Sequence, residues 1–553
     1  MNTYNDKIIY QIYVKSFMDT TGNGHGDING ITRRLDYLED LGVDYLWLTP
    51  VFVSPMNDNG YDVADYKKID PAFGTMDDLI ELISKAKEKG LGIMLDMVFN
   101  HSSTSHEWFQ KALDGNQKYQ DYYIFKEGKE NKPPTNWISK FGGSAWSYVP
   151  QLKKYYLHLF DETQADLNWE NPHLREELYD IVRFWMNKGI QGFRFDVVNL
   201  ISKPEIYKDD FIGDGRRFYT DGPKVHTYLK ELNEKTFGQM DDSITVGEMS
   251  STDLENCILY SKPEEKELSM VFNFHHLKVD YEDGDKWSLK DFDFKMLKEI
   301  FDHWQTGMQE NQGTMALFYN NHDQPRVVSR FGDDQNFLDK SAKMLATSIH
   351  LLRGTPYIYQ GEEFGMTNAN FASIEDYRDV ESTNYYKILK ENGVDDNKIM
   401  AILGSKSRDN GRTPMLWSPD EGRGFTMGVP WLPFAKVRGI SQQEDQEKED
   451  SIQEYYKQLI QLRKKEKAIQ VGQYEMLEKN HESLFVYTRS YNQERILVLN
   501  NFYEDDVMFD LEKNHLPAYC EETYQILLTN TDGIRIQEGK ILLQAYDALI
   551  LKF

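Results

Sequence analysis

Short apolar runs recur along the chain, and each is followed by a stretch whose apolar positions repeat with a helical period. This alternation is typical of parallel β-strands connected by α-helices. It predicts amphipathic helices over 76–89 and 172–188. Predicted strands cover 8–13, 45–49, 92–98, 192–198, 244–248, 270–274, 316–320 and 356–360. Eight strands with helices between them favour an α/β fold, a closed (β/α)₈ barrel, over an open sheet.

Two long segments interrupt this alternation. Residues 102–171, after the third strand, are rich in Trp, Tyr, Gly and Asn and too long for an ordinary loop, so we expect an inserted subdomain B. A polar insertion over about 365–431 follows the eighth strand, and both should cover the catalytic face, where barrel strands end. From 472 to 553 the pattern changes to alternating strands, which predicts a C-terminal antiparallel β-sandwich. The barrel itself is expected over 1–101 and 172–471.

The formal net charge of −27 at pH 7 argues against general binding to nucleic acid or to an anionic membrane. Cys257 and Cys520 are the only cysteines, too few for a disulfide framework. No targeting signal and no run of about 20 apolar residues is visible. We therefore expect a monomeric cytoplasmic protein that acts on a small molecule.

Polar side chains gather where the predicted strands end. They are Asp96 and His101 after the third strand, Arg194 and Asp196 on the fourth, Glu248 at the end of the fifth, and His322 and Asp323 after the seventh. In a barrel these ends open onto one shared pocket. Each residue by itself is as easily part of a structural ion pair, but the ordered set favours a catalytic site.

Cleavage of a glycosidic bond needs one carboxylate at the anomeric carbon and one carboxylic acid that protonates the leaving oxygen. Arg194 precedes Asp196 by two positions, so both side chains should point the same way and the guanidinium should keep Asp196 ionised. Glu248 follows an apolar strand, and burial beside another carboxylate should raise its pKa to suit a proton donor. Asp323 is placed to stabilise a positively charged transition state, with His322 and His101 near sugar hydroxyls.

Five segments resemble the motifs of glycoside hydrolase family 13, the α-amylase family, in order and spacing. They are Asp-Met-Val-Phe-Asn-His at 96–101, Gln-Ala-Asp-Leu-Asn-Trp at 164–169, Gly-Phe-Arg-Phe-Asp at 192–196, Val-Gly-Glu at 246–248 and Asn-His-Asp at 321–323. The resemblance implies retention through a covalent glucosyl-enzyme, with Asp196 as nucleophile, Glu248 as acid/base and Asp323 as stabiliser. It also implies a glucose site formed by Asp62, His101, Arg194, His322 and Arg412, flanked by Phe141 and Phe160.

A glycine-rich loop near the N-terminus places oxygen ligands at alternating positions, as hard cations require. Its residues are Asp19, Thr21, Asn23, His25 and Asp27. It resembles the calcium loop of the family, but Thr21 and Asn23 stand where many relatives carry acids. The alternatives are a structural Ca²⁺ and an empty glycine-rich turn. No organic cofactor is expected.

Within the family the chain looks most similar to the oligo-1,6-glucosidase group, and there to hydrolases of trehalose 6-phosphate. The likeness rests on residues 213–226, 246–252 and 274–281, and Val197 after the nucleophile argues against a preference for α-1,4 links. A dianionic substrate needs local cations in so acidic a protein. The resemblance points to His275 and Lys286 as phosphate ligands, with Arg216, Arg217, Lys224 and Lys278 as weaker candidates.

Three hypotheses stay open. The first is hydrolysis of trehalose 6-phosphate to glucose and glucose 6-phosphate. The second is hydrolysis of unphosphorylated isomaltose-like sugars, or glucosyl transfer through the same intermediate. The third is a non-catalytic amylase-like binding domain, which the presence of all three carboxylates disfavours.

Overall fold

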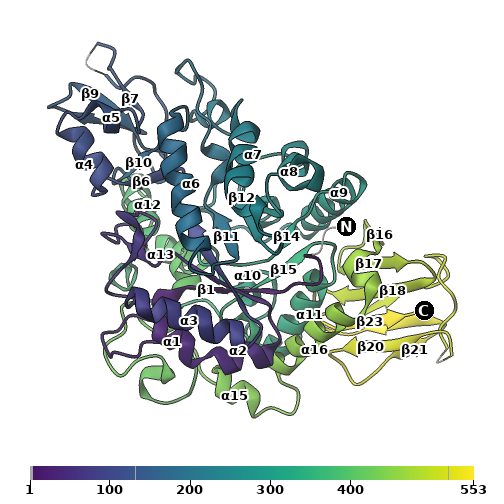
Figure 1. Cartoon of the computed structure of the whole chain (residues 1–553). Helices are drawn as coiled ribbons and strands as arrows, with labels where there is room; N and C mark the ends of the chain where they lie inside the picture. The colour runs from purple at the N-terminus through teal and green to yellow at the C-terminus, as the bar shows by residue number, and fades with distance from the viewer. Residues whose placement is uncertain (1–3, 131, 521) are drawn as a thin grey trace.

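The computed structural model describes residues 4–130, 132–520 and 522–553. Its centre is a barrel of eight parallel strands in chain order (Figure 1). They are β1 (Ile9–Ile12), β2 (Tyr45–Leu48), β5 (Gly92–Met97), β11 (Gly192–Phe195), β12 (Ile244–Glu248), β13 (Met270–Phe272), β14 (Ala316–Leu317) and β15 (Thr355–Tyr359). A parallel bridge between Val271 and Met315 closes the ring between β13 and β14. The predicted (β/α)₈ barrel is confirmed.

Three strands end two or three residues earlier than predicted, the fourth at Phe195, the sixth at Phe272 and the seventh at Leu317, and side chains explain the last two. The seventh strand was expected to reach residue 320, but its pairing stops at Leu317. The carbonyl oxygen of Phe318 accepts a hydrogen bond from the His276 ring (2.7 Å) and is not paired with a neighbouring strand. The sixth strand ends at Phe272 because a short 3₁₀ turn, η6 (His275–Leu277), begins soon afterwards. Both changes occur at the end of the barrel where the site lies.

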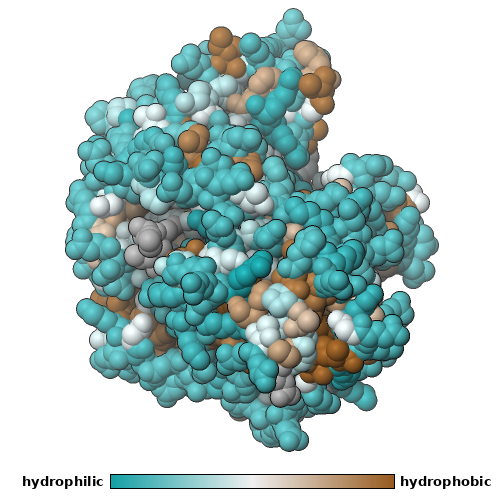
Figure 2. Space-filling view, turned by 90° about the vertical axis from the view of Figure 1, so that its right-hand side faces the viewer, coloured by the Kyte–Doolittle hydropathy of each residue, from teal (hydrophilic) through white to brown (hydrophobic). Residues whose placement is uncertain are grey.

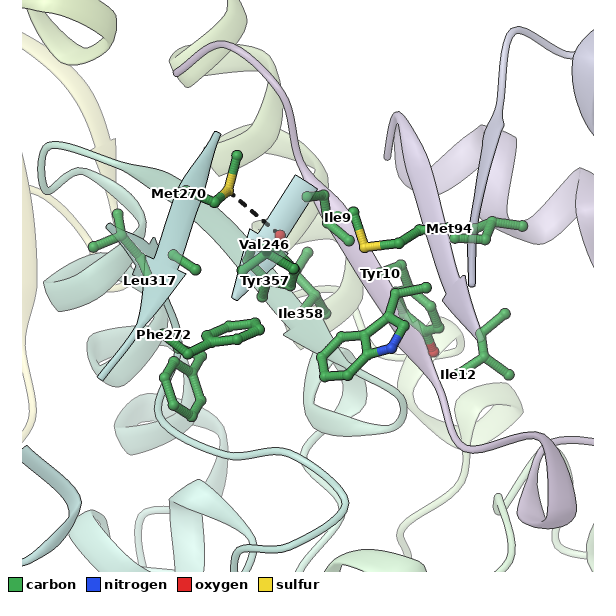
Figure 3. Packing of buried hydrophobic residues seen from close by; sticks show 14 of the residues in the cluster. Ile9, Tyr10, Ile12, Met94, Val246, Met270, Phe272, Leu317, Tyr357 and Ile358 are labelled. Carbon is green, nitrogen blue, oxygen red and sulfur yellow. Dashed lines mark hydrogen bonds between the residues drawn. The ribbon is translucent and has the colours of Figure 1, made fainter. Parts of the chain in front are cut away.

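Apolar side chains fill the interior of the barrel, so it is a packed core and no channel. Figure 3 shows members of this core, among them Tyr10, Met94, Val246, Phe272 and Tyr357, which come from different strands and are all at most 4% exposed. The hydroxyl of Tyr357 donates to the sulfur of Met270 (3.4 Å), which satisfies this buried polar group. The core fixes the strand ends that carry the site.

Helices surround the barrel, and their ends carry recognisable caps. Helix α3 (Met76–Glu88) begins with a capping box between Thr75 and Asp78, and α6 (Pro172–Met186) begins with Pro172 after the cap Asn171. Both helices agree with the predicted ranges to within two residues. The others in the ring are α1 (Ile28–Arg33), α2 (Leu35–Leu41), α7 (Val225–Lys235), α8 (Leu254–Ser261), α9 (Phe294–Glu310), α11 (Leu338–His350) and α16 (Ile452–Lys465).

The segment after β5 forms a separate layer over one end of the barrel (Figure 1, upper left). It contains α4 (Glu107–Leu113), α5 (Gln117–Gln120), a three-stranded antiparallel sheet and a two-stranded pair. The sheet is formed by β7 (Phe125–Lys126), β9 (Lys154–Leu157) and β8 (Trp146–Val149), and the pair by β6 (His101–Ser103) and β10 (Gln164–Asp166). After β15 the second insertion adds α12 (Val380–Glu391), α13 (Asp396–Lys406) and α14 (Asp409–Arg412). The domain boundaries themselves stay predictions.

The C-terminal strands form two antiparallel sheets on the far side of the barrel from subdomain B (Figure 1, yellow). One holds β16 (Gln473–Leu477), β17 (Leu484–Tyr491), β18 (Glu494–Asn501), β23 (Ala548–Lys552) and β20 (Gln525–Thr529). The other holds β19 (Val507–Phe509), β22 (Lys540–Leu543) and β21 (Arg535–Gln537). The predicted antiparallel β domain is confirmed.

The surface on this side of the molecule is mostly hydrophilic (Figure 2). None of the helices in the described part of the chain has the length and the apolar composition that crossing a bilayer requires.

Candidate active site

Arg194 lies at the centre of the predicted carboxylates and bonds to three of them. Strand β11 runs between β5 and β12, and its register sets Arg194 beside Asp96. Nη1 of Arg194 donates to Oδ1 of Asp96 (2.6 Å) and to Oδ1 of Asp196 (2.7 Å), and Nη2 contacts Oε2 of Glu248. The strand spacing therefore brings Arg194 and Asp196 together as predicted.

Asp96 supports this arrangement through its own hydrogen bonds. Its carboxylate is 1% exposed and also accepts hydrogen bonds from Trp47 Nε1 (3.2 Å) and the Tyr61 hydroxyl (2.9 Å). With both oxygens occupied, Asp96 is a positioning residue that holds the Arg194 guanidinium in place.

Asp196 and Glu248 share the guanidinium group of Arg194 and have different affinities for protons. Nη1 of Arg194 bonds Asp196, and Nη2 contacts Glu248. Burial raises the pKa of Asp196 to about 6, against the opposing charge of Arg194. Burial raises the pKa of Glu248 to about 8, again against Arg194 and with the help of the Asp196 and Asp323 charges. Near neutral pH, Asp196 is ionised and Glu248 carries a proton.

The predicted rise in the pKa of Glu248 is found, and Asp196 is ionised near neutral pH as expected. The guanidinium group of Arg194 is shared among three carboxylates, so it lowers the pKa of Asp196 by less than burial raises it. Asp196 still loses its proton at a lower pH than Glu248 does.

Val197, directly after Asp196, has a left-handed backbone with φ +33°. This region is costly for a β-branched residue and is usual at functional sites. The turn ends β11 and begins the short η2 (Val198–Leu200). It carries the Val197 amide to 3.5 Å from Oε2 of Glu248, so the backbone at the end of β11 also contacts the second carboxyl group.

Asp323 lies opposite this pair among positive and hydrogen-bonding groups. Its Oδ1 accepts from Arg412 Nη2 (2.7 Å) and Arg408 Nη1 (3.3 Å), and its Oδ2 is 3.2 Å from His322 Nε2. Although burial opposes the shift, the His322 ring and the two guanidinium groups hold the pKa of Asp323 well below its usual range. Its side chain, 27% exposed, is the most accessible of the three carboxylates.

His322 is a neutral hydrogen-bond donor. Burial lowers the pKa of its imidazole to about 3. Its Nδ1 is 2.8 Å from the side-chain amide nitrogen of Gln11, which donates, so the proton sits on Nε2. The ring stacks on Tyr61 with centroids 5.2 Å apart. Nε2 lies beside Asp323 and has a proton to donate.

Asp62 is held within its own loop, and its contact with glucose stays a prediction. Its carboxylate is fully buried and accepts hydrogen bonds from Ser54 Oγ (2.9 Å) and from the backbone amides of Asn57 (3.0 Å) and Asp58 (3.1 Å). Asp62 therefore shapes its own loop. Asp58, four residues earlier, contacts Arg408 Nη2 (3.2 Å) and is the aspartate of this loop that reaches the site.

Arg408 is the second residue that the sequence analysis missed. Besides Asp323 and Asp58, it pairs with Asp379 (2.6 Å) and lies 3.5 Å from Glu381. Its guanidinium also covers the ring of Phe141 at 5.0 Å. Arg408 and Arg412 come from the insertion after β15, so this insertion completes the site as its position predicted.

The remaining predicted glucose contacts lie on the subdomain side. His101 is buried, 3.2 Å from the Tyr61 carbonyl and from the Gln164 side-chain nitrogen, and burial lowers its pKa to about 4. Its ring is 5.2 Å from that of Phe160, which in turn meets Phe141 edge to face at 5.6 Å. The two phenylalanines thus lie together between His101 and Arg408.

The two predicted phosphate ligands are placed differently. Lys286 forms an ion pair with Glu381 (2.7 Å), and through Glu381 and Arg408 it is connected to Asp323. His275 packs on Trp304 with ring centroids 5.0 Å apart, and its Nδ1 is buried without a hydrogen-bond partner among the described residues. Burial, aided by nearby Lys278, lowers the pKa of His275 to about 4, so the ring is neutral.

The residues of the predicted calcium loop do not fit a cation. Both oxygens of Asp19 accept hydrogen bonds, from the amides of Thr21, Gly22 and Gly24 and from the Thr426 hydroxyl. Asp27 accepts from Thr20 and Gly30. Within the described ranges, no group of three or more His, Cys, Asp or Glu side chains is arranged to hold a metal ion. Donors occupy the oxygens that Ca²⁺ would need.

This geometry provides a nucleophilic carboxylate, a protonated carboxyl bonded to the same guanidinium group, and a third carboxylate held by Arg408 and Arg412. Inverting glycosidases keep their two carboxyl groups about 6.5–9.5 Å apart to hold a water between them, and retaining ones about 5–5.5 Å. Two carboxyl groups on neighbouring nitrogens of one guanidinium group fit the closer, retaining arrangement.

The comparison with protein families agrees with this site. Residues 11–472 match the family described as alpha amylase, catalytic domain. This chain belongs to the α-amylase family. Residues 484–550 match the domain described as alpha-amylase SusG C-terminal domain. The family match spans the barrel, both insertions and every predicted site residue, and it makes the chain a glycoside hydrolase.

Relatives within the family cover the chain almost completely. A trehalose-6-phosphate hydrolase of Bacillus subtilis is 52% identical over 550 residues, which is 99% of this chain and 97% of that protein. An oligo-1,6-glucosidase of Bacillus cereus is 44% identical and covers 99% of both chains. The crystal structure of Bacillus licheniformis trehalose-6-phosphate hydrolase is 50% identical, with a TM-score of 0.94 over 100% of both chains.

Proposed function

We propose that this enzyme is a retaining α-glucosidase that hydrolyses trehalose 6-phosphate to glucose and glucose 6-phosphate. The observation that carries the glycosidase part is that Arg194 bonds both Asp196 and Glu248, two carboxyl groups whose pKa values lie on either side of neutral pH. The substrate is supported by the similarity to trehalose-6-phosphate hydrolases over nearly the whole chain.

In the first step, Asp196 attacks the anomeric carbon of the unphosphorylated glucose and forms an ester. The bond to the bridging oxygen breaks, and Glu248 gives its proton to that oxygen, so glucose 6-phosphate leaves as a neutral alcohol at this position. In the second step, the ionised Glu248 takes a proton from water, which attacks the same carbon and releases Asp196. Two inversions give net retention.

The other groups act on the sugar between these steps. Asp323 is held ionised by Arg408 and Arg412 and faces the carbon that gains positive charge, which lowers the energy of the transition state. The Nε2–H of His322 donates to a sugar hydroxyl, and Asp58 accepts from another. Phe141 and Phe160 border the ring, where their apolar surfaces suit the faces of a pyranose.

The phosphate would occupy the side of the pocket beyond Glu248. We assign Lys286 and His275 to it, as the sequence resemblance implies. The support for Lys286 is its half-buried side chain, which is connected to the site through Glu381 and Arg408. The support for His275 is its unpaired ring nitrogen. Glu381 partly neutralises Lys286, so these two residues alone leave little net positive charge for a dianion.

An oligo-1,6-glucosidase activity is the second candidate, because the Bacillus cereus relative matches the full length and Lys286 has an acidic partner. Steady-state kcat/KM values for trehalose 6-phosphate, trehalose and isomaltose separate the two. We expect the phosphorylated sugar to be preferred over both by more than about 100-fold. Equal or lower values for trehalose 6-phosphate would discard the phosphate assignment and favour the second candidate.

We further propose that the enzyme works as a monomer in the cytoplasm and binds neither nucleic acid nor membranes. The two cysteines are unpaired, Cys257 buried and Cys520 exposed, and the net charge is strongly negative. Size-exclusion chromatography with light scattering tests the monomer, and cell fractionation tests the location.

A further inference from the structure

Lys140 of the inserted subdomain reaches the acid/base loop of the barrel. Its backbone amide bonds to the Leu159 carbonyl (2.9 Å), so it is fixed beside Phe160. Its ammonium group lies 5.8 Å from the centre of the Phe160 ring and donates to Ser250 Oγ (2.7 Å). Ser250 follows Glu248 by two residues. A cation from another part of the chain therefore lies beside the proton donor.

The position of Ser250 is fixed, so the position of the ammonium group is fixed as well. Ser250 exchanges two backbone hydrogen bonds with the side chain of Asn199, which donates to the Ser250 carbonyl (2.9 Å) and accepts from its amide (2.9 Å). Because Glu248 protonates the oxygen of the leaving group, side chains of its loop face the leaving half of the substrate. Lys140 is thus on the side of the departing sugar.

Lys140 forms no ion pair with a described residue. No carboxylate oxygen among them lies within 4.0 Å of its nitrogen, whereas Lys286 is paired with Glu381 and Arg216 with Asp214. Burial, with nearby Arg216, lowers the pKa of the half-buried Lys140 to about 8, although the charges of Asp214 and Glu248 oppose the shift. A half-buried cation without a bonded anion is costly, and an anionic ligand would reduce this cost.

A second contact joins the same parts of the chain. The amide of Ile138 bonds to the Asp214 carbonyl (3.0 Å), and Asp214 holds Arg216. The subdomain loop of Lys140 is therefore attached to the loop after β11 that carries Arg216. Lys278, after η6, is a further lysine without an ion pair in the described part of the chain. The surplus positive charge of this side of the site comes from Lys140 and Lys278.

We propose that Lys140 binds the phosphate of the leaving sugar and is a specificity-determining residue for phosphorylated disaccharides. This rests on the proposed function, since it concerns the same reaction. In the free enzyme Lys140 donates a hydrogen bond to Ser250 Oγ. When the substrate binds, the ammonium group also donates to the phosphate. The inserted subdomain thereby contributes to phosphate recognition together with the barrel loops.

The test compares Lys140→Met with the wild type on trehalose 6-phosphate and on p-nitrophenyl α-glucoside, which has no phosphate. We expect kcat/KM for the phosphorylated sugar to fall about 10- to 100-fold, mainly through KM, and that for the aryl glucoside to change by less than about threefold. The inhibition constant of glucose 6-phosphate should rise by a factor similar to that of KM. Lys140→Arg should recover most of the loss because it keeps the charge.

Lys129→Met is the matched control, since Lys129 is an exposed lysine of the same subdomain outside the site. An equal loss on both substrates would assign Lys140 a structural role through Ser250, and unchanged kinetics on the phosphorylated sugar would remove it from the phosphate site. If Lys140→Met does not fold, Lys140→Gln and its inhibition by glucose 6-phosphate decide the question. If the wild type prefers trehalose 6-phosphate and Lys140→Met keeps the same preference, only the role of Lys140 is refuted. A wild type without the preference refutes the proposed function itself.

Discussion

Nη1 of Arg194, on β11, lies 2.7 Å from Oδ1 of Asp196, just beyond the end of the same strand. The two-residue spacing of a strand makes this contact possible, and the left-handed turn at Val197 ends the strand before a third side chain points the same way. Because Arg194 also bonds Asp96 and contacts Glu248, one guanidinium group sets the geometry of the carboxyl pair. The reaction depends on that pair.

Substitution of Asp196 and substitution of Glu248 should have different effects on substrates with different leaving groups. Asp196→Asn removes the nucleophile and should lower kcat/KM at least about 10⁴-fold on every substrate. Glu248→Gln should cost about 10²- to 10⁴-fold on a disaccharide but far less in the first step with p-nitrophenyl α-glucoside, whose leaving group needs no proton. Burst kinetics on the aryl glucoside measures that step. An equal loss on both substrates for Glu248→Gln would contradict its role as proton donor, and circular dichroism checks the fold.

The pH dependence follows from the two pKa values. Below a pH of about 6, Asp196 gains a proton and stops being a nucleophile, and above about 8, Glu248 loses the proton it must give. The kcat/KM profile on isomaltose should therefore be bell-shaped with limbs near these values. An unphosphorylated sugar is needed because a phosphate itself titrates near pH 6. Glu248→Gln should remove the basic limb, and a basic limb that persists in this variant would assign it to another group.

Substitution of Asp58 should mainly lower activity, and substitution of Asp62 should mainly lower stability. Asp58 contacts Arg408 at the site, so Asp58→Asn should lower kcat/KM about 10- to 100-fold on phosphorylated and plain substrates alike. Asp62 is hydrogen-bonded only within its loop, so Asp62→Asn should lower the melting temperature more than Asp58→Asn does. Differential scanning fluorimetry and kinetics on both variants check this. A larger loss of activity for Asp62→Asn than for Asp58→Asn would show that Asp62 contacts the glucose.

Lys286 should act on the phosphorylated substrate alone. Lys286→Met removes the cation but leaves Glu381 unpaired, so KM for trehalose 6-phosphate should rise at least about tenfold. Hydrolysis of p-nitrophenyl α-glucoside should change much less. Lys390→Met is the control, because it removes a lysine that is paired with Asp396 on the surface and lies on α12, the helix that also carries Glu381. A similar effect of both variants on KM would argue against a phosphate contact at Lys286.

Calcium should not stabilise the protein. The oxygens of Asp19 and Asp27 are already bonded to backbone amides and hydroxyls, and Thr426 closes the loop against the second insertion. The melting temperature in excess EDTA and in millimolar Ca²⁺ should agree within about 1 °C. Asn23→Asp, which restores an acid to the loop, is the matched variant that could gain calcium dependence. A clear rise of the wild-type melting temperature with Ca²⁺ would show that the loop rearranges to bind it.

The sequence predicted the barrel because its eight strands are short apolar runs, and burial on both faces leaves such runs few alternatives. It also predicted Asp196, Glu248 and Asp323, since strand ends meet at one pocket. The sequence could not distinguish the roles of Asp58 and Asp62, because both are acidic residues of one loop. Only the structure shows that backbone amides of this loop donate to the Asp62 carboxylate. Arg408 and Lys140 were missed because their partners are distant in sequence and no periodicity links them.

The most direct test of the account is proton NMR of the products formed from trehalose 6-phosphate by the wild-type enzyme. It should show glucose and glucose 6-phosphate in equal amounts, with the glucose released first as the α-anomer and converting to β only by later mutarotation. Glucose that appears first as the β-anomer, or a phosphorylated sugar that remains intact while isomaltose is cleaved, would contradict it.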